Sequence, residues 1–410
     1  MKKILTCLTP ALLIGLLAAC VRSTTPTASA VLPPAPTGTS LPPTVTPVPV
    51  PITDLTDLSM HDSATGWAWA TRPDNSFQLL RTADGGQTWS DVTPVNLPIV
   101  SSGSFFLDGQ NAWVQLFDSA DNSSGLAYTG DGGRTWSELD NALPFVNAGL
   151  TFIDPKNGWA ESADVGAGNA YITVYATTDG GASWSQLPLQ GPNAGLTAST
   201  FGTVHLCNIC GDTLYYDPLR LIVTSGDLAS DPGGAVRLSI STDQGQTWKD
   251  LKLPLPGAKY HAYLIAAHAP TFFTPNDGLL PVQMTATTST SSATALAIYA
   301  SHDGGSSWTA LPAVLEDASP FDPAEFVSPL DGFARCGNAL CSTNDGALTW
   351  QTLPPGLNFD SSAASDYVFH YEFVSPTTGW AITTDGSAST LWTTTTNGAN
   401  WTKLSPTLVP

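Results

Sequence analysis

The sequence contains few basic residues. Only 14 of its 410 residues are Lys or Arg, against 34 Asp or Glu, and the formal net charge is −20 at pH 7. Binding to nucleic-acid phosphates requires a basic surface, and so does adhesion to anionic lipid headgroups. The composition therefore argues against nucleic acid as a partner and against a direct electrostatic contact with a membrane surface.

Long hydrophobic runs are absent after the first 20 residues. Residues 1–20 begin with Lys2 and Lys3 and continue with an apolar run from Ile4 to Ala19, which is short for a transmembrane helix. The run ends in Leu17-Ala18-Ala19-Cys20, which resembles the lipobox of bacterial lipoproteins. The resemblance implies a signal peptide over residues 1–20 and a lipid on Cys20, which anchors an extracytoplasmic protein to a bacterial membrane. The alternative is an ordinary secretion signal with a chance cysteine.

Residues 21–52 lack the apolar side chains that a folded core requires. They are rich in Thr, Pro, Ser and Ala, as in Pro33-Pro34-Ala35-Pro36. Such a segment cannot bury enough surface to fold, and its prolines hold it extended. We expect a tether between the membrane and a folded domain over residues 53–410.

Cysteines are scarce beyond the signal segment. Apart from Cys20, only two close pairs remain: Cys207 with Cys210, and Cys336 with Cys341. In an exported protein the sequence favours two local disulfides. A redox Cys-x-x-Cys or a four-cysteine zinc site is the alternative, but the two pairs lie in repeats that are not adjacent.

Recognisable catalytic and cofactor motifs are also missing. Nucleophile-elbow, Walker and zincin patterns do not occur. The six histidines show no metal-ligand spacing, and the five glutamates (138, 161, 316, 325 and 372) show no spacing that singles out a catalytic pair. We therefore predict no cofactor, no metal and no catalytic residue.

One eight-residue turn motif occurs seven times along the chain. Its clearest copy is Thr82-Ala83-Asp84-Gly85-Gly86-Gln87-Thr88-Trp89. The last copy is degenerate: we align it with Thr395 to Trp401, one residue short and with Asn397 in place of the aspartate. The residues that define the copies are Asp84, Gly85, Trp89; Asp131, Gly132, Trp136; Asp179, Gly180, Trp184; Asp243, Gly245, Trp248; Asp303, Gly304, Trp308; Asp345, Gly346, Trp350; and Asn397, Trp401.

The chemistry of this turn is that of a connection between two strands. The aspartate is a short acceptor for the backbone N–H groups that follow it. The glycines allow the positive φ that a tight turn requires. The tryptophan then opens the next strand and is expected to bury its ring. We expect these residues to be structural.

The turns recur at the spacing of propeller blades. Successive tryptophans of the turn are separated by 42 to 64 residues, by subtraction of their numbers. Before each turn a short strand is followed by a second one that opens with Gly or Asn and often an aromatic residue, as in Gly66-Trp67, Gly158-Trp159 and Gly379-Trp380. Four short strands per repeat predict an all-β, seven-bladed β-propeller with four-stranded blades. The first strands are expected at Leu55–Met60, Trp67–Thr71 and Phe77–Arg81, and the last at Trp401–Leu404. With no visible strand exchange, the ring is expected to close by packing alone.

The turn resembles the Asp-box, or bacterial neuraminidase repeat, of sialidases, other glycoside hydrolases and sortilin-type receptors. The paired pattern F-x-x-x-x-x-G-W-A and T-x-D-G-G-x-T-W is more similar to the photosystem II stability/assembly factor-like propellers. The resemblance covers roughly residues 53–404 and implies a role in the assembly or stability of a membrane complex. A sialidase would also need an R-I-P signature, which this sequence lacks, and an arginine triad, whereas only six arginines follow the tether.

Variable loops are expected on one face of the propeller. If the repeated turn joins the third and fourth strands, the second-to-third connections and the connections between blades lie on the opposite face. These are the connections that vary, around residues 117–125, 162–169, 218–234 and 285–294, and binding usually sits on such loops. The candidate contact patch there is Tyr215, Tyr216, Arg220, Tyr260 and Tyr263, with packing inside an enlarged blade as the alternative.

Together these features predict a non-catalytic, lipid-anchored propeller that binds a protein partner or an envelope polymer. The alternative is a carbohydrate-active protein of the Asp-box type, either a glycoside hydrolase or a glycan binder.

Overall fold

The computed structural model describes residues 50–409 except 53, 101–102, 119–122, 140–142, 146–147, 167–168, 188–212, 218, 226–234, 244–245, 258–259, 288–291, 319–323 and 361–365. Residues 47–410 form one compact unit. The lipidation site Cys20 and most of the predicted tether lie outside the described residues, as do Cys207 and Cys210.

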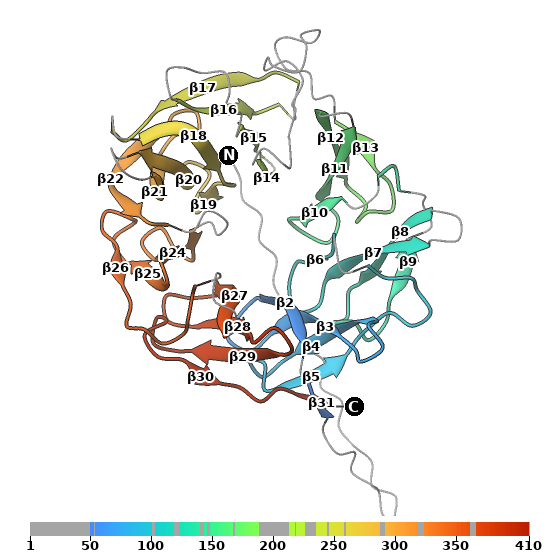
Figure 1. The fold of residues 1–410 in the computed structure, drawn as a ribbon. Helices are drawn as coiled ribbons and strands as arrows, with labels where there is room; N and C mark the ends of the chain where they lie inside the picture. Colours follow the sequence, from blue (N-terminus) through green and yellow to red (C-terminus); the bar gives the residue numbers. More distant parts are fainter. Residues whose placement is uncertain are drawn as a thin grey trace, which may run out of the picture. The chain divides into compact units, whose positions relative to one another are not determined.

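The described chain folds into seven antiparallel sheets arranged as the blades of a ring (Figure 1). Blades 1 and 2 contain β2 (Leu55–Met60), β3 (Gly66–Thr71), β4 (Phe77–Thr82) and β5 (Thr88–Asp91), then β6 (Phe105–Phe106), β7 (Ala112–Asp118), β8 (Ser123–Thr129) and β9 (Ser137–Leu139). Blades 3 and 4 contain β10 (Gly149–Phe152), β11 (Gly158–Gly166), β12 (Asn169–Thr177) and β13 (Ser185–Gln186), then β14 (Thr213–Asp217), β15 (Arg220–Ser225), β16 (Ala235–Ser241) and β17 (Lys249–Pro254).

The remaining blades follow the same order, with one broken strand. In blade 5 the first strand is divided into β18 (Tyr260–Ala267) and β19 (Thr271–Phe272), followed by β20 (Gly278–Thr287), β21 (Ser292–Ser301) and β22 (Thr309–Glu316). Blades 6 and 7 contain β23 (Glu325–Phe326), β24 (Gly332–Cys336), β25 (Ala339–Thr343) and β26 (Gln351–Thr352), then β27 (Tyr367–Phe373), β28 (Gly379–Thr384), β29 (Ser389–Thr394) and β30 (Thr402–Lys403).

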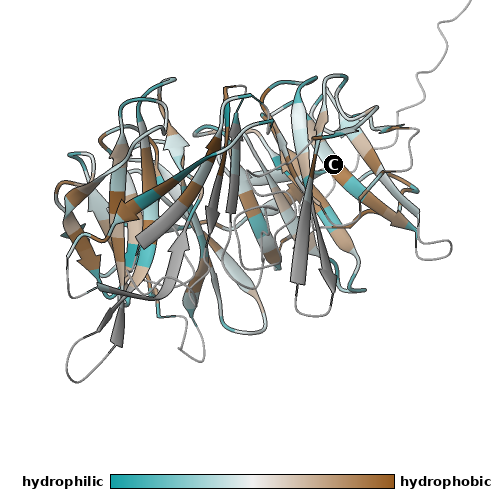
Figure 2. Cartoon of the chain, turned by 90° about the horizontal axis from the view of Figure 1, so that it is seen from above, coloured by the Kyte–Doolittle hydropathy of each residue, from teal (hydrophilic) through white to brown (hydrophobic). Residues whose placement is uncertain are grey.

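This arrangement confirms the predicted seven-bladed β-propeller with four-stranded blades. The strands expected in blade 1 agree with β2, β3 and β4 to within one residue. The described residues form strands and turns without a helix. Hydrophobic residues lie along the strands, whereas the turns are mostly hydrophilic (Figure 2). The core is therefore divided among the spaces between successive sheets.

The ring does not close by packing alone, so that expectation is wrong. After blade 7 the chain crosses to blade 1, where β31 (Thr407–Val409) pairs in parallel with β5. β1 (Val50–Pro51), which the sequence places at the end of the tether, pairs antiparallel with β31. The sheet of blade 1 thus gains two outer strands, one from each side of the propeller sequence. The closing strand β31 is only three residues long, which is too short for a strand to be recognised from its sequence pattern.

Each repeated turn joins the third and fourth strands of its blade, so all of the turns lie on one face. We call it the turn face, and the opposite face the loop face. In blade 1, Asp84 Oδ1 accepts hydrogen bonds from the backbone N–H of Gln87 (3.1 Å) and of Thr88 (2.9 Å), and Oδ2 accepts one from the Thr88 hydroxyl (2.6 Å). Burial disfavours the Asp84 anion, but these hydrogen bonds outweigh it and hold the pKa of Asp84 below its usual value.

The second glycine of the turn is a contact between blades. The hydroxyl of Thr82 accepts a hydrogen bond from the Gly86 N–H at 3.0 Å. Gly86 has φ 89°, and a Cβ there would lie 3.1 Å from Leu391 of blade 7. Gly181 meets Leu126 of blade 2 in the same way. Each such turn therefore anchors its blade to the preceding one.

The seventh turn is full length, which corrects the sequence alignment. The Thr394 hydroxyl accepts from the Gly398 N–H (3.1 Å), as Thr82 does from Gly86, and the Thr396 hydroxyl accepts from the Asn400 N–H (3.0 Å). Thr396 therefore holds the aspartate position. Asn397 takes the place of the first glycine, with φ 58°, which asparagine tolerates better than most residues.

The largest buried rings come mainly from the second strands. Trp67, Trp69, Trp113 and Trp380 are at most 1% exposed. Several indole N–H groups reach the next blade: that of Trp113 donates to the Gly180 carbonyl (2.9 Å), and that of Trp380 donates to the Gly85 carbonyl across the closing joint (3.0 Å).

The tryptophans of the turn are buried unequally, contrary to the expectation that each buries its ring. Trp89 is fully buried and Trp308 is 6% exposed, whereas Trp136, Trp184 and Trp350 are only half-buried. Trp89 lies in a cluster that includes Leu408 of the closing strand β31, which is paired with β5 in blade 1.

The substitution Thr396→Asp is expected to stabilise the protein. A carboxylate at this position can accept the several hydrogen bonds that Asp84 accepts, and each net hydrogen bond contributes about 1 kcal/mol. The thermal unfolding midpoint should rise. Thr395→Asp is the matched control, because it adds the same charge at the neighbouring exposed position, and an equal rise in both variants would contradict this reading.

Trp89→Ala should cost about 3–5 kcal/mol, because it empties a fully buried aromatic site. Trp136→Ala should cost less, since its ring is half-buried. Denaturant unfolding of both variants tests the difference. Equal losses would show that burial does not set the contribution of these tryptophans.

Candidate functional site

The innermost strands bring together ionisable side chains that are distant in sequence. Glu325 and Glu372 hold the same place in blades 6 and 7: each precedes a phenylalanine and pairs with the second residue of the next strand, Phe333 or Trp380. Asp57 of β2 and His370 of β27 lie at the joint between blades 7 and 1, where Nδ1 of His370 is 3.7 Å from Oδ1 of Asp57. We call Asp57, Glu325, His370 and Glu372 the inner cluster.

Glu372 joins the inner strands of blades 7 and 1. Its Oε1 accepts a hydrogen bond from the Met60 N–H at 2.6 Å, on the inner edge of a sheet where a strand N–H lacks a strand partner. Burial raises the pKa of Glu372 to about 8; the Met60 hydrogen bond opposes this rise, and the charges of Glu325 and Asp57 add to it. Glu372 is therefore mainly a neutral carboxylic acid at pH 7.

A second glutamate, Glu161, is half-buried and stands at a strand position where two other blades have a hydrogen-bond donor to the next blade. Gln115 of blade 2 donates to the Ala148 carbonyl (2.5 Å), and Arg335 of blade 6 donates to the Val368 carbonyl (2.9 Å). Glu161 holds the same strand position in blade 3, and burial raises its pKa to about 7. Burial therefore raises the pKa of both Glu161 and Glu372.

Sequence reasoning missed the inner cluster because its members belong to different repeats. Met60 and Glu372 are 312 residues apart and meet only when the ring closes. The signal was present in the repeats, since Glu325-Phe326 and Glu372-Phe373 precede Gly332 and Gly379 at the same distance. An alignment of the first strands would have shown the repeated glutamate.

Two members of the predicted contact patch, Arg220 and Tyr260, are buried. Arg220 is only 4% exposed; its guanidinium lies 4.1 Å from the Phe272 ring centre of blade 5, Nη2 donates to the Pro275 carbonyl (2.7 Å), and Nε is 3.1 Å from Asp217. Tyr260 is buried and donates to Glu316 (2.8 Å). Blade 4 lacks the usual Gly-Trp pair, and Arg220 joins it to blade 5 instead.

The remaining members of the predicted contact patch are Tyr215, Tyr216 and Tyr263. Tyr215 is half-buried, and its hydroxyl donates to Asp217 Oδ2 (3.0 Å). The side chains of Tyr216 and Tyr263 lie outside the described residues. The alternative of packing inside an enlarged blade therefore describes Tyr215, Arg220 and Tyr260.

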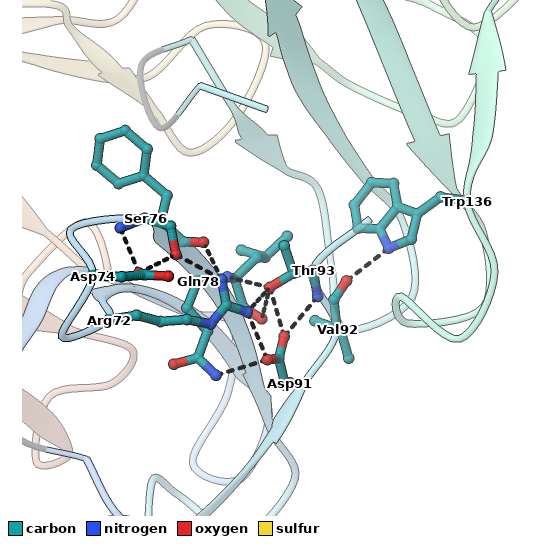
Figure 3. Close-up of polar contacts among 10 residues, drawn as sticks. Arg72, Asp74, Ser76, Gln78, Asp91, Val92, Thr93 and Trp136 are labelled. Carbon is teal, nitrogen blue, oxygen red and sulfur yellow. Dashed lines mark hydrogen bonds and ion pairs between the residues drawn. The ribbon is translucent and has the colours of Figure 1, made fainter. Parts of the chain in front are cut away.

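Arginines of the described part are used mainly within the fold. On the loop face of blade 1, Nη2 of Arg72 lies 2.8 Å from Oδ2 of Asp91, which also accepts a hydrogen bond from Gln78, and the indole N–H of Trp136 in blade 2 donates to the Val92 carbonyl nearby (Figure 3). Arg81 donates from Nε to the Gly109 carbonyl of blade 2 at 2.8 Å. Positive charge is thus placed at joints and turns.

The structure also bears on the cysteine and metal predictions. Cys336 and Cys341 form a disulfide across the β24–β25 hairpin, which confirms that pair. Within the described residues no group of three or more His, Cys, Asp or Glu side chains is arranged to hold a metal ion. In the same part of the chain we find no helix that meets the length and hydropathy of a membrane span.

Glu161 and Glu372 should lower the stability as the pH rises from about 5 to about 8, whereas His61, whose pKa burial lowers, should raise it over the lower part of this window. The folded-state pKa values of Glu372 (about 8) and Glu161 (about 7) exceed their usual value of 4.5. At these two glutamates the folded state therefore binds more protons than the unfolded state in this window, and the stabilisation they give is lost as the pH increases. Thermal midpoints of the parent, Glu161→Gln and Glu372→Gln at pH 5, 6.5 and 8 test this: both variants should flatten the decline, and an unchanged decline would contradict the assignment.

Comparisons with known proteins identify the fold but not the function. No family model matches the chain, and no curated protein matches it. Among solved structures, the chain is similar to YCF48 bound to a D1 peptide (18% identity, 85% of this chain and 94% of that chain, TM-score 0.48). It is also similar to an ulvan lyase of polysaccharide lyase family PL25 (9%, 88% and 96%, TM-score 0.50). A third is the β-propeller domain of the Trilobed protease from Pyrococcus furiosus (8%, 86% and 97%, TM-score 0.50). At these identities the likeness identifies the chain as a β-propeller and leaves its activity open.

Proposed function

We propose that the chain is a non-catalytic binding protein that contacts a partner protein or an envelope polymer through the loop face. The sequence resemblance to photosystem II stability/assembly factor-like propellers suggests a role in the assembly or stability of a membrane complex. In this proposal Cys20 carries the lipid anchor, residues 21–52 form the tether, and the repeated turns are Asp-boxes with a structural role.

The observation that carries the proposal is the unequal length of the hairpins on the loop face. In blade 3 the pairing of β11 with β12 continues to Gly166 and Asn169, and in blade 5 the pairing of β20 with β21 continues to Thr287 and Ser292. These strands have 9 and 10 residues, whereas β24 and β25 of blade 6 have 5. Elongated hairpins on a rigid scaffold are suited to contacting a ligand.

The use of the carboxylates on the turn face supports a binding role rather than catalysis. Aspartates of the repeated turns are held by hydrogen bonds within those turns; those from Thr135 and Thr129 hold the pKa of Asp131 at about 2. The first-to-second strand turns use Asp62, Asp108 and Asp154 in a similar way. These groups stay ionised and fixed, and a general acid requires a proton near neutral pH.

The disulfide supports an extracytoplasmic location. Stable disulfides form in oxidising compartments, and Cys341 is buried where it links to Cys336 at the loop-face end of blade 6. This agrees with the signal and lipid expected from residues 1–20.

The proposal is tested by trimming one hairpin. The outer pairs Thr285–Thr294, Ala286–Ala293 and Thr287–Ser292 are removed together with residues 288–291, and Met284 is joined to Ala295 by Asn-Gly, which favours a tight hairpin turn. Met284 and Ala295 are buried and are kept. The full-length protein is used as bait in detergent-solubilised membranes of its source, and bound proteins are identified by mass spectrometry.

We expect one membrane complex to be retained by the parent and lost by the trimmed variant. Arg134→Ala, an exposed change on the turn face, is the control and should retain it. Retention by the trimmed variant would overturn the loop-face assignment, and the absence of any specific protein would overturn the protein partner in favour of a polymer.

A carbohydrate-active protein is the second candidate, and the inner cluster is the observation that favours it. Glycoside cleavage uses a carboxylic acid that stays protonated near neutral pH beside a second carboxylate, and Glu372 lies near Asp57 and Glu325. Its hydrogen bond to Met60 equally suits a structural role. Sugar release from envelope polysaccharides by the parent, abolished in Glu372→Gln, would support an enzyme; no release by the parent would exclude this role for those substrates.

A further inference from the structure

The connector between blades 5 and 6 is hydrogen-bonded to both blades. It leaves β22 at Glu316 and turns at Asp317, whose φ of 56° is a left-handed conformation that aspartate tolerates better than most residues. The Ala318 N–H then donates to the Thr294 carbonyl of blade 5 (3.1 Å), and the Asp317 carbonyl accepts from the Gly337 N–H of blade 6 (2.6 Å). Two consecutive residues thus link the β20–β21 hairpin of blade 5 to the β24–β25 hairpin of blade 6.

The connector is also fixed by burial and by a bridge to the disulfide. Ala318 is 5% exposed and packs in a cluster that contains Leu296 of blade 5 and Phe326 of blade 6. It forms an isolated antiparallel bridge with Cys336, one half of the disulfide. A displacement of Cys336 would therefore move Ala318, and Ala318 would move Thr294 with it.

The base of the blade 5 hairpin depends on this connector along its outer edge. The pairing of β21 with β22 ends at Ala295 and Glu316. Beyond that pair, the outer edge of β21 is continued by the bond between the Ala318 N–H and the Thr294 carbonyl. On the inner side, Tyr260 of β18 pairs with β20, and its hydroxyl donates to Glu316 (2.8 Å). The connector thus supports the side of the hairpin that β22 does not reach.

The disulfide holds the end of the blade 6 hairpin. The ladder of β24 and β25 runs as far as the pair Cys336–Ala339. Arg335, one residue earlier, is buried and donates to the Val368 carbonyl of blade 7 (2.9 Å), which anchors the hairpin up to that point. Beyond it, the disulfide joins Cys336 to the buried Cys341, five residues later. A crosslink over so short a separation constrains the unfolded chain less than a long-range one, so its main effect is local.

We propose that the disulfide between Cys336 and Cys341 positions the long hairpin of blade 5 through Asp317 and Ala318, so that the two hairpins form one rigid contact surface for a partner protein. Contacts of this kind lose less conformational entropy on binding when the surface is already ordered. The role in binding rests on the proposed function of the loop face, whereas the positioning of the hairpin does not.

The test compares amide hydrogen exchange in the full-length parent and in two variants that each remove the disulfide. Cys336→Ala changes a half-buried side chain, and Cys341→Ala changes a buried one. Asn338→Ala is the matched control, because it is an exposed change in the turn of the same hairpin and keeps the disulfide. The amides of Ala318 and Gly337 are the reporters. Amides of the β11–β12 hairpin in blade 3, which contains no cysteine, report global stability.

We expect the Ala318 and Gly337 amides to exchange about tenfold faster in both cysteine variants, because a local opening becomes easier. They should be unchanged in Asn338→Ala, and the blade 3 amides should be unchanged in every variant. An unaltered Ala318 amide would overturn the proposal. An equal increase in blade 3 would assign the disulfide to global stability, and an increase confined to Cys341→Ala would trace the effect to lost packing; either result would also overturn it.

Binding is measured separately with the same proteins. In the pull-down described above, Cys336→Ala should retain less of the complex held by the parent, and Asn338→Ala should retain it fully. Undiminished retention by Cys336→Ala would overturn the shared contact surface. If the parent itself retains no complex, the proposed function fails, while the exchange of the Ala318 amide still decides whether the disulfide positions the hairpin.

Discussion

The fold depends on one hydrogen bond, from the backbone N–H of the second glycine of the turn to the threonine or serine hydroxyl that begins it. It measures 3.0 Å in blade 1, 2.9 Å in blade 3 and 2.8 Å in blade 5. In blades 1, 3 and 5 the bond places a glycine against the preceding blade, where a Cβ would crowd a leucine or isoleucine. Blade 6 makes the same bond with Ala347 (2.9 Å), so a single methyl group is accommodated there. The aspartate then fixes the rest of the turn. A local turn therefore determines the spacing of whole sheets.

This use of aspartate explains the composition. An aspartate stands in nearly every turn-face connection. The structural requirements of the turns therefore account for much of the negative net charge, which does not have to reflect a basic ligand. The same turns lower the pKa values of their aspartates and remove them from acid–base chemistry. The exceptions are the half-buried Glu161 and Glu372, whose raised pKa values link stability to pH. Negative charge is thus mostly structural.

Features set by local chemistry were predictable from the sequence. The number of blades, the place of the turns and the hairpin disulfide follow from residues within a few positions of one another. Contacts made between repeats were not. Arg220 is polar and follows a loop, so it suggested a surface, yet the missing Gly-Trp pair of blade 4 draws it onto Phe272. The seventh turn was recognised but misaligned by one residue, because Thr396 has a hydroxyl where the other turns have a carboxylate. The members of the inner cluster are distant in sequence and come together only when the ring closes.

The composite sheet of blade 1 has a consequence for biosynthesis. β5 is made early, but its neighbour β31 follows the seventh blade, and β1 pairs only with β31. During translation, blades 1 to 7 can therefore dock in order while the outer edge of blade 1 stays unpaired until residues 407–409 emerge. Contacts between such distant segments form slowly, so the completed ring is the last product of folding, and a ribosome stalled near the end of the message would leave an open arc with an exposed strand edge.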